Sequence, residues 1–296
     1  MKQSVQKLLV ASSQKIDKLD AEILLAHVIQ KSREFLFANP EFEINFWQKI
    51  KFDKFVKQRQ KNISVAYLIG HKEFFGLDFL VNKNVLVPRP DTELMVKTAL
   101  EHLNTSSPNH ILLLDVGTGS GCIPISVIKT LKHKNIKTIA VDISTKALGI
   151  AKKNAKKYNV EIKFLHGNLL EPVIKNISLN QFKSMLITAN LPYLTNKQFE
   201  TENSIQHEPK LALVADNDGL ALYEELLKQI ATFHTCPPSG RVPLSSFLEI
   251  DPSQTNKIKI LIKKYLPESS IEIKKDLAGL DRLAVINFKI NYPIPN

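Results

Sequence analysis

Strand-like and helix-like segments alternate along the second part of this chain, and this alternation limits the possible fold more than any other feature. Seven apolar runs, most of them separated by helical patterns, lie at about residues 110–115, 136–142, 161–165, 184–190, 245–250, 270–276 and 282–289. Such alternation is typical of a doubly wound, mostly parallel sheet. The last two runs have no helix between them, so we expect an antiparallel pair at the sheet edge. The sequence therefore predicts a Rossmann-like α/β domain with a seven-stranded sheet.

The first 72 residues have a different pattern. Apolar residues recur there at helical spacing, as in Ile16, Leu19, Ile23 and Leu24, which predicts a small helical domain. Apolar residues then follow the turn residue Gly76 in a pattern typical of a hairpin. A chain of 296 residues is long enough for two domains. We therefore expect a helical domain at 1–72, a hairpin linker at 73–90 and the α/β domain at 91–296.

Two polar segments are expected to interrupt these elements. The block Pro88-Arg-Pro-Asp-Thr-Glu93 stops the hairpin, and either Asp91 or Thr92 is placed to cap the following helix. The stretch from Thr232 to Pro243 is rich in Pro, Ser and Gly, which predicts a mobile surface loop.

Composition limits the surroundings and partners of the chain. No apolar run approaches the roughly 18 to 20 residues that span a bilayer, and the N-terminus has no secretory pattern, so we expect a cytoplasmic protein that does not enter membranes. The net charge of +11 is compatible with a polyanionic partner, but the lysines are spread along the chain, which favours a solvated surface. We expect a monomer that does not bind nucleic acid directly. The two cysteines and eight histidines show no metal-ligand spacing, so no metal is expected.

A glycine-rich turn follows the first predicted strand of the sheet and precedes a helix. Nucleotides bind at this position in open α/β sheets, and glycines let a ligand approach the backbone. The sequence departs from a dinucleotide fingerprint because Cys122 replaces the last small residue and an acid precedes the first glycine. The turn supplies six candidate cofactor-binding residues: Asp115, Gly117, Thr118, Gly119, Ser120 and Gly121.

Two carboxylates narrow the choice of cofactor. Asp115 lies where it can pair with an ammonium group or approach a sulfonium, and S-adenosylmethionine carries both. Asp142 ends the second strand about 20 residues after the turn, where a carboxylate can accept hydrogen bonds from ribose hydroxyls. Alternatively, Asp142 caps the next helix together with Ser144. The pair of acids favours the S-adenosylmethionine site of a class I methyltransferase.

A weaker candidate lies after the third strand. Asn168 could bond the amino edge of an adenine ring, with Leu169 beside it. An asparagine in a turn needs no ligand to explain it, so both interpretations stay open.

The fourth strand ends in an unusual polar turn, Asn190-Leu191-Pro192-Tyr193. The nitrogen of an amide or exocyclic amine is hard to methylate because its lone pair is delocalised, so an enzyme must orient it. The Oδ1 atom of Asn190 and the carbonyl of Leu191 could each accept one N–H, while Tyr193 packs on the planar group. We expect these four residues to be catalytic and Asn190 also to contact the cofactor.

At this point the sequence resembles the PrmC/HemK protein-glutamine methyltransferases, which modify the Gly-Gly-Gln motif of class-I peptide release factors. The resemblance covers nearly the whole chain. Beside the segments already described, it includes Glu208-Pro209, Asp218-Gly219-Leu220 and Lys275 to Gly279. It implies transfer of a methyl group from S-adenosylmethionine to N5 of that glutamine. It also implies that the N-terminal helical domain helps to grip the release factor.

One departure concerns the catalytic turn. The family usually has Asn-Pro-Pro-Tyr, whereas this chain has Leu191 in place of the first proline. Proline would fix its own φ and restrict Asn190. We expect weaker preorganisation rather than lost activity, and a higher turnover number for Leu191→Pro.

Two rival functions remain open from the sequence. An N6-adenine DNA or RNA methyltransferase uses a similar tetrapeptide, but it must flip its base or take a single strand, and no target-recognition region is evident. A catalytically silent S-adenosylmethionine-binding protein could instead recognise release factors without modifying them, and Leu191 is the feature that favours it.

Overall fold

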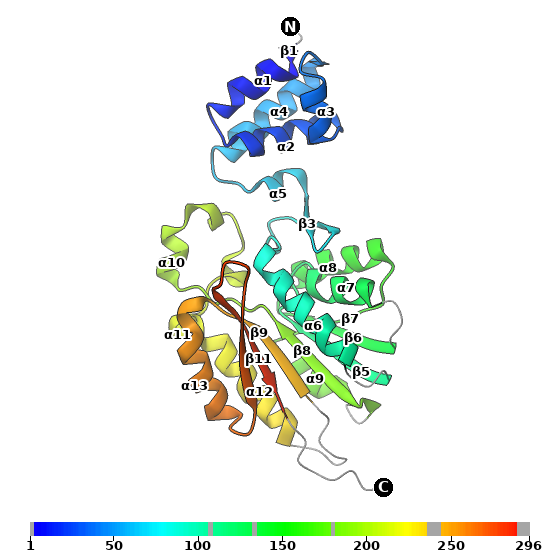
Figure 1. Cartoon of the computed structure of the whole chain (residues 1–296), viewed down its shortest axis with the longest axis vertical. Coiled ribbons are helices and arrows are strands. Elements are labelled where there is room, and N and C mark those ends of the chain that lie inside the picture. The colour runs from blue at the N-terminus through cyan, green and yellow to red at the C-terminus, as the bar shows by residue number, and fades with distance from the viewer. Residues whose placement is uncertain (1–2, 106–108, 132–134, 179–180, 236–243, 289–296) are drawn as a thin grey trace.

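We describe a computed structural model of the chain over residues 3–105, 109–131, 135–178, 181–235 and 244–288. Its first part is helical and lies apart from a larger sheet-containing part (Figure 1). The elements of the helical part are β1 (Gln3–Ser4), α1 (Val5–Ser13), α2 (Lys18–Ile29), α3 (Arg33–Ala38), β2 (Glu43–Ile44), α4 (Phe46–Arg59) and α5 (Val65–Ile69).

The N-terminal helices surround their own apolar core. Leu24 and Leu25 of α2 pack with Leu36 and Phe52, all of them almost fully buried. Polar side chains begin these helices. Asp17 caps α2, and Asn45 forms a capping box with Gln48 at the start of α4.

A hairpin of β3 (His71–Phe74) and β4 (Leu77–Leu80) follows the helices. Phe74 and Phe79 are buried in a core that also contains Met95 of α6 (Glu93–Thr105). The hairpin therefore packs on the larger part of the molecule.

The predicted seven-stranded, mostly parallel sheet is confirmed, with the order β10-β11-β9-β8-β5-β6-β7. Strands β9, β8, β5, β6 and β7 are parallel, and β11 runs antiparallel to both neighbours, as expected for the final pair. The strands are β5 (Asn109–Val116), β6 (Asn135–Asp142), β7 (Lys163–His166), β8 (Ser184–Ala189), β9 (Leu244–Glu249), β10 (Ser270–Lys275) and β11 (Asp281–Asn287).

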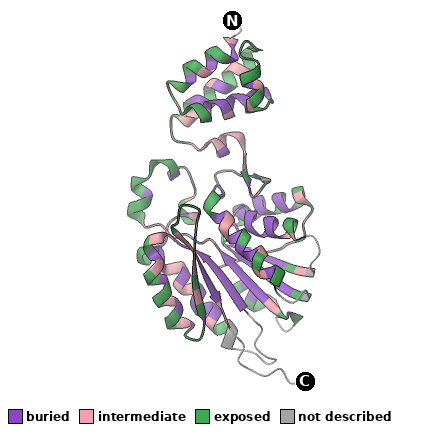
Figure 2. Cartoon of the chain, viewed as in Figure 1, coloured by how far each residue is buried: buried purple, intermediate pink, exposed green. Residues whose placement is uncertain are grey.

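The central strands are buried on both faces, as their apolar sequences require (Figure 2). Side chains alternate between the faces, so Ile111 and Leu113 pack with α6 and α7, whereas Leu112 and Leu114 pack with α9, α12 and α13. The remaining helices are α7 (Cys122–Thr130), α8 (Thr145–Tyr158), α9 (Glu171–Asn176), α10 (Asn196–Thr201), α11 (Asp216–Gly219), α12 (Ala221–Thr235) and α13 (Thr255–Tyr265).

Two local expectations have different outcomes. The predicted loop from Thr232 begins within α12, which continues to Thr235, and residues 236–243 lie outside the described residues. Before α6, a 3-10 turn spans Pro90–Thr92 without a side-chain cap, so capping of the helix by Asp91 or Thr92 was wrong. No helix in the described part of the chain combines the length and apolarity needed to cross a membrane.

Candidate active site

The glycine-rich turn connects β5 to α7 at the carboxyl edge of the sheet. The backbone N–H groups of Gly117 and Thr118 donate to the carbonyl of Val141, at 2.9 and 3.0 Å, which holds the turn against β6. Gly117 has φ +73°, and a Cβ there would lie 3.0 Å from Cδ2 of Leu191. The backbone conformation therefore favours glycine at 117, and the Leu191 side chain would have to shift to make room for a Cβ.

Asp142 joins the ends of two elements at this edge. One carboxylate oxygen accepts the N–H of Gly119 and the other accepts the N–H of Ser144, each at 2.8 Å. The helix cap itself is Ser144, whose hydroxyl accepts from Ala147. Burial raises the pKa of Asp142, and the two N–H donors oppose that shift. The carboxylate thus organises the turn and still has lone pairs for a ligand.

Asp115 faces the interior of the domain. Its Oδ1 accepts a hydrogen bond from the hydroxyl of Thr188 at 2.7 Å. Burial raises its pKa to about 6, and the nearby Asp142 adds to that increase. Asp115 is almost fully buried, so its side chain lies in the interior at the start of the turn.

A cavity opens above these residues and brings most of the predicted site together. The predicted residues that line it are Gly117, Thr118, Gly119, Ser120, Asp142, Asn168, Leu169, Asn190, Leu191 and Pro192. Asp115, Gly121 and Tyr193 are not among the described residues that line it. The cavity also has a wall that we did not predict, formed by Val85, Leu86, Pro88, Arg89, Thr92, Pro209, Leu211 and Ala212.

Asn168 lies at the edge of the cavity, where its amide donates to Glu171 at 3.4 Å. Leu169 is buried beside it with φ +47°. The geometry is compatible with a ligand contact and with an ordinary turn, so the predicted adenine contact stays a prediction.

The turn after β8 is held on several sides. The amide Nδ2 of Asn190 donates to the hydroxyl of Thr92 at 3.1 Å, which leaves the Oδ1 atom as the free acceptor of that side chain. The carbonyl of Tyr193 accepts from Gln254 at 2.9 Å. The hydroxyl of Tyr193 donates to Glu249 at 3.3 Å, and its ring packs on the core. This position gives no support to the predicted packing of Tyr193 on a planar substrate.

Sequence reasoning missed the contacts that build the unpredicted wall. Glu208 is buried, accepts the N–H of Val87 at 3.1 Å and forms an ion pair with Arg89, which lines the cavity. Both partners belong to segments that carry the resemblance to the protein-glutamine methyltransferases. Their separation in the chain concealed the pairing.

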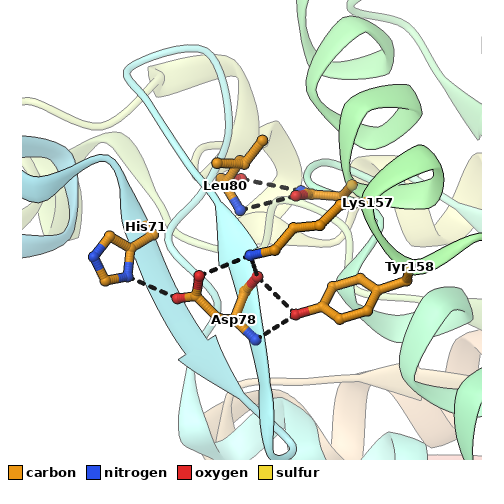
Figure 3. A network of polar contacts seen from close by, with 6 residues as sticks. His71, Asp78, Leu80, Lys157 and Tyr158 are labelled. Carbon is orange, nitrogen blue, oxygen red and sulfur yellow. Dashed lines mark hydrogen bonds and ion pairs between the residues drawn. The ribbon is translucent and has the colours of Figure 1, made fainter.

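The hairpin is bound to α8 by a polar network (Figure 3). Asp78 forms a hydrogen bond with His71 and an ion pair with Lys157, each at 2.7 Å, and its backbone N–H donates to the hydroxyl of Tyr158. The buried Asn154 exchanges two hydrogen bonds with Leu80 and donates a third to the carbonyl of Ser120 at 2.9 Å. Asn154 therefore connects the hairpin to the glycine-rich turn.

These features fit a nucleoside cofactor with a cationic part. Glycines leave room above the turn, and Asp142 lines the cavity with its carboxylate. Asn190 lines the same cavity, with its Nδ2 engaged by Thr92. The arrangement can hold such a cofactor beside a planar nitrogen.

Comparisons with known proteins agree with this arrangement. A family model described as PrmC N-terminal domain matches residues 2–70, and one described as Methyltransferase small domain matches residues 92–208. The release factor glutamine methyltransferase of Bacillus anthracis is 32% identical over 270 residues, covering 90% of this chain and 91% of that protein. The protein of the same name from Flavobacterium psychrophilum is 35% identical over 271 residues, covering 90% of each chain.

Among solved structures, the N-terminal domain of human METTL16 in complex with SAH gives a TM-score of 0.52 at 18% identity, covering 89% of this chain and 93% of that one. The human METTL16 catalytic domain with MAT2A 3′UTR hairpin 1 gives 0.55 at 15% identity, covering 92% and 93%. At these identities the likeness shows the fold.

Proposed function

The chain belongs to the release factor glutamine methyltransferases, and from that membership we propose the details of its reaction. The acceptor is N5 of the glutamine in the Gly-Gly-Gln motif of a class-I release factor, and the cofactor is S-adenosylmethionine. The observation that carries this proposal is the position of Asn190, which lines the cavity with its Nδ2 engaged by Thr92 and its Oδ1 without a hydrogen bond among the described residues.

The side chains have distinct parts in this proposal. The glycine-rich turn and Asp142 hold the cofactor, which supplies the methyl group as a sulfonium. Asn190 accepts one N–H of the substrate amide through Oδ1, and the carbonyl of Leu191 accepts the other. Fixing both N–H groups would direct the nitrogen at the methyl carbon, so orientation and exclusion of water would provide most of the rate. The new nitrogen–carbon bond would replace the carbon–sulfur bond of the cofactor, and the amide nitrogen would release one of its two protons to solvent.

The N-terminal helices would position the release factor near the cavity. Tyr67 of α5 donates its hydroxyl hydrogen to the carbonyl of Val85 at 2.5 Å, and Val85 lines the cavity. His207 contacts the carbonyl of Lys61 at 2.6 Å. We propose the division 1–72, 73–90 and 91–296 because the helical part has an apolar core of its own, and limited proteolysis should cut first in the segment that joins the helical part to the sheet-containing part.

Mass spectrometry of an intact release factor incubated with the enzyme and cofactor tests the reaction. We expect one added methyl group on the Gly-Gly-Gln glutamine, lost in Asn190→Ala and retained in the control Asn256→Ala on the exposed surface of α13. Methylated adenine in DNA beside an unmodified release factor would support the nucleic-acid enzyme. Cofactor binding without methyl transfer to either would support the silent binding protein.

A further inference from the structure

Leu191 is closely packed in this structure, although the family usually has proline at its position. Its side chain is 3% exposed and belongs to the main apolar core. It lies over Gly117 and lines the cavity. The leucine side chain therefore connects the catalytic turn to the glycine-rich turn.

The backbone N–H of Leu191 also has a specific partner. It donates to the hydroxyl oxygen of Tyr223, a fully buried residue of α12, at 3.2 Å. That hydroxyl donates its own hydrogen to the carbonyl of Glu249, the last residue of β9. The carbonyl oxygen of Leu191 lies 3.4 Å from the same hydroxyl. A proline at 191 could not donate this hydrogen bond because it has no N–H.

The hydrogen bonds join the catalytic turn to a rigid support. Glu249 pairs with β11 and ends β9, which lies inside the sheet, so its carbonyl position is determined by strand pairing. Tyr223 spans from this carbonyl to the N–H of Leu191, and a buried hydrogen bond resists rotation of the peptide that it holds.

We propose that Tyr223 is the positioning residue of the catalytic turn, because its hydroxyl joins the N–H of Leu191 to the carbonyl of Glu249. The inference deepens the proposed function and rests on it. It reverses the expectation from the sequence: Leu191→Pro should lower turnover, because it removes the N–H and the side chain over Gly117.

Replacement of Tyr223 by phenylalanine removes the hydroxyl and keeps the ring. We expect kcat for the release factor to fall about tenfold, the rate equivalent of one lost hydrogen bond. The KM for the release factor and the Kd for S-adenosylmethionine should change by less than about twofold, because Tyr223 contacts neither ligand. Tyr265→Phe is the matched control, because it removes a tyrosine hydroxyl that donates to Glu224 at 2.5 Å, away from the turn.

A double-mutant cycle separates positioning from a general loss of stability. In the Leu191→Pro background, Tyr223→Phe should change kcat by less than about twofold, since the donor that the hydroxyl held is already absent. In Leu191→Ala, which keeps the N–H, Tyr223→Phe should retain its effect. Independent, multiplicative effects of Tyr223→Phe and Leu191→Pro would overturn the proposal.

Amide exchange gives a second readout that does not depend on the substrate. Hydrogen–deuterium exchange of the peptide containing residues 190–194 should be faster in Tyr223→Phe and unchanged in Tyr265→Phe. Unchanged exchange in Tyr223→Phe would overturn the inference even in an active enzyme. A wild-type enzyme that leaves the release factor unmodified would instead overturn the proposed function, and the exchange result would still decide the role of Tyr223.

Discussion

Gly219 lies directly against the carbonyl of Tyr193, so closely that a Cβ on Gly219 would be 1.9 Å from the carbonyl oxygen. Gln254 reinforces this contact by donating to the carbonyls of both Tyr193 and Asp218, at 2.9 and 2.8 Å. The segment before α12 therefore supports the catalytic turn from behind.

Gly219→Ala should displace the catalytic turn. The position has φ +79°, which disfavours any side chain, and the new methyl group would overlap backbone that Gln254 holds. We expect a loss of about 2 to 4 kcal/mol in unfolding free energy and at least a tenfold decrease in kcat. Gly149→Ala in α8 is the control, because nothing lies within 4 Å of its Cβ position, and it should stabilise by about 1 kcal/mol. Equal stability of both variants would contradict this account.

Asp142→Ala should weaken S-adenosylmethionine binding. The variant loses the proposed ribose acceptor and also releases the N–H of Gly119 from its partner. We expect a cost of about 1.5 to 3 kcal/mol in binding free energy, measured by calorimetry. The affinity of Asp142→Asn, which keeps one acceptor oxygen, should lie between that of the wild type and that of Asp142→Ala. An affinity equal to that of the wild type would remove Asp142 from the site.

Glu249 should make stability depend on pH. Burial raises its pKa to about 7 from 4.5, and the Thr92 hydroxyl and Arg282 oppose this only in part. Because the folded-state pKa is the higher one, its contribution to stability is complete below about pH 4.5 and is lost as the pH rises through about 7. From pH 4.5 to 8, the wild type should lose about 3 kcal/mol relative to Glu249→Gln. Urea unfolding at several pH values measures this difference, and a constant difference would refute the argument.

Trp47→Ser should weaken binding of the release factor. Trp47 is 75% exposed on α4 beside the exposed Phe46, an aromatic pair that has little reason to face water unless it meets a partner. We expect the KM for the intact release factor to rise about tenfold, while kcat changes little. A short Gly-Gly-Gln peptide should react far worse with the wild type and equally poorly with Trp47→Ser. Ile260→Ser, at a 68% exposed residue of α13, is the control.

The sequence alone determined the class of fold and the location of the cofactor turn. Alternating strands and helices, the glycines from 117 to 121 and the acid at 142 are local patterns, and each strand carries its own tip to the same edge of a parallel sheet. The lining of the cavity by most of the predicted residues follows from this rule.

The direction of individual side chains needed the tertiary structure. The packing of Tyr193 on the planar substrate stays a prediction, and the structure adds that the Tyr193 hydroxyl donates to Glu249 while Gln254 donates to the Tyr193 carbonyl. Asp115 shares the face of Ile111 and Leu113, and the pleat therefore places its carboxylate in the interior, against Thr188.

The tertiary structure also decided every contact between segments that are distant in the chain. Thr92 engages Asn190, Glu208 pairs with Arg89, and Tyr223 holds Leu191. Such pairs leave no periodic pattern in the sequence, because they depend on how helices and loops pack on the sheet. The sequence therefore located the turn that orients the substrate, and the packing of α12 and the residues before α6 determined how rigidly it is held.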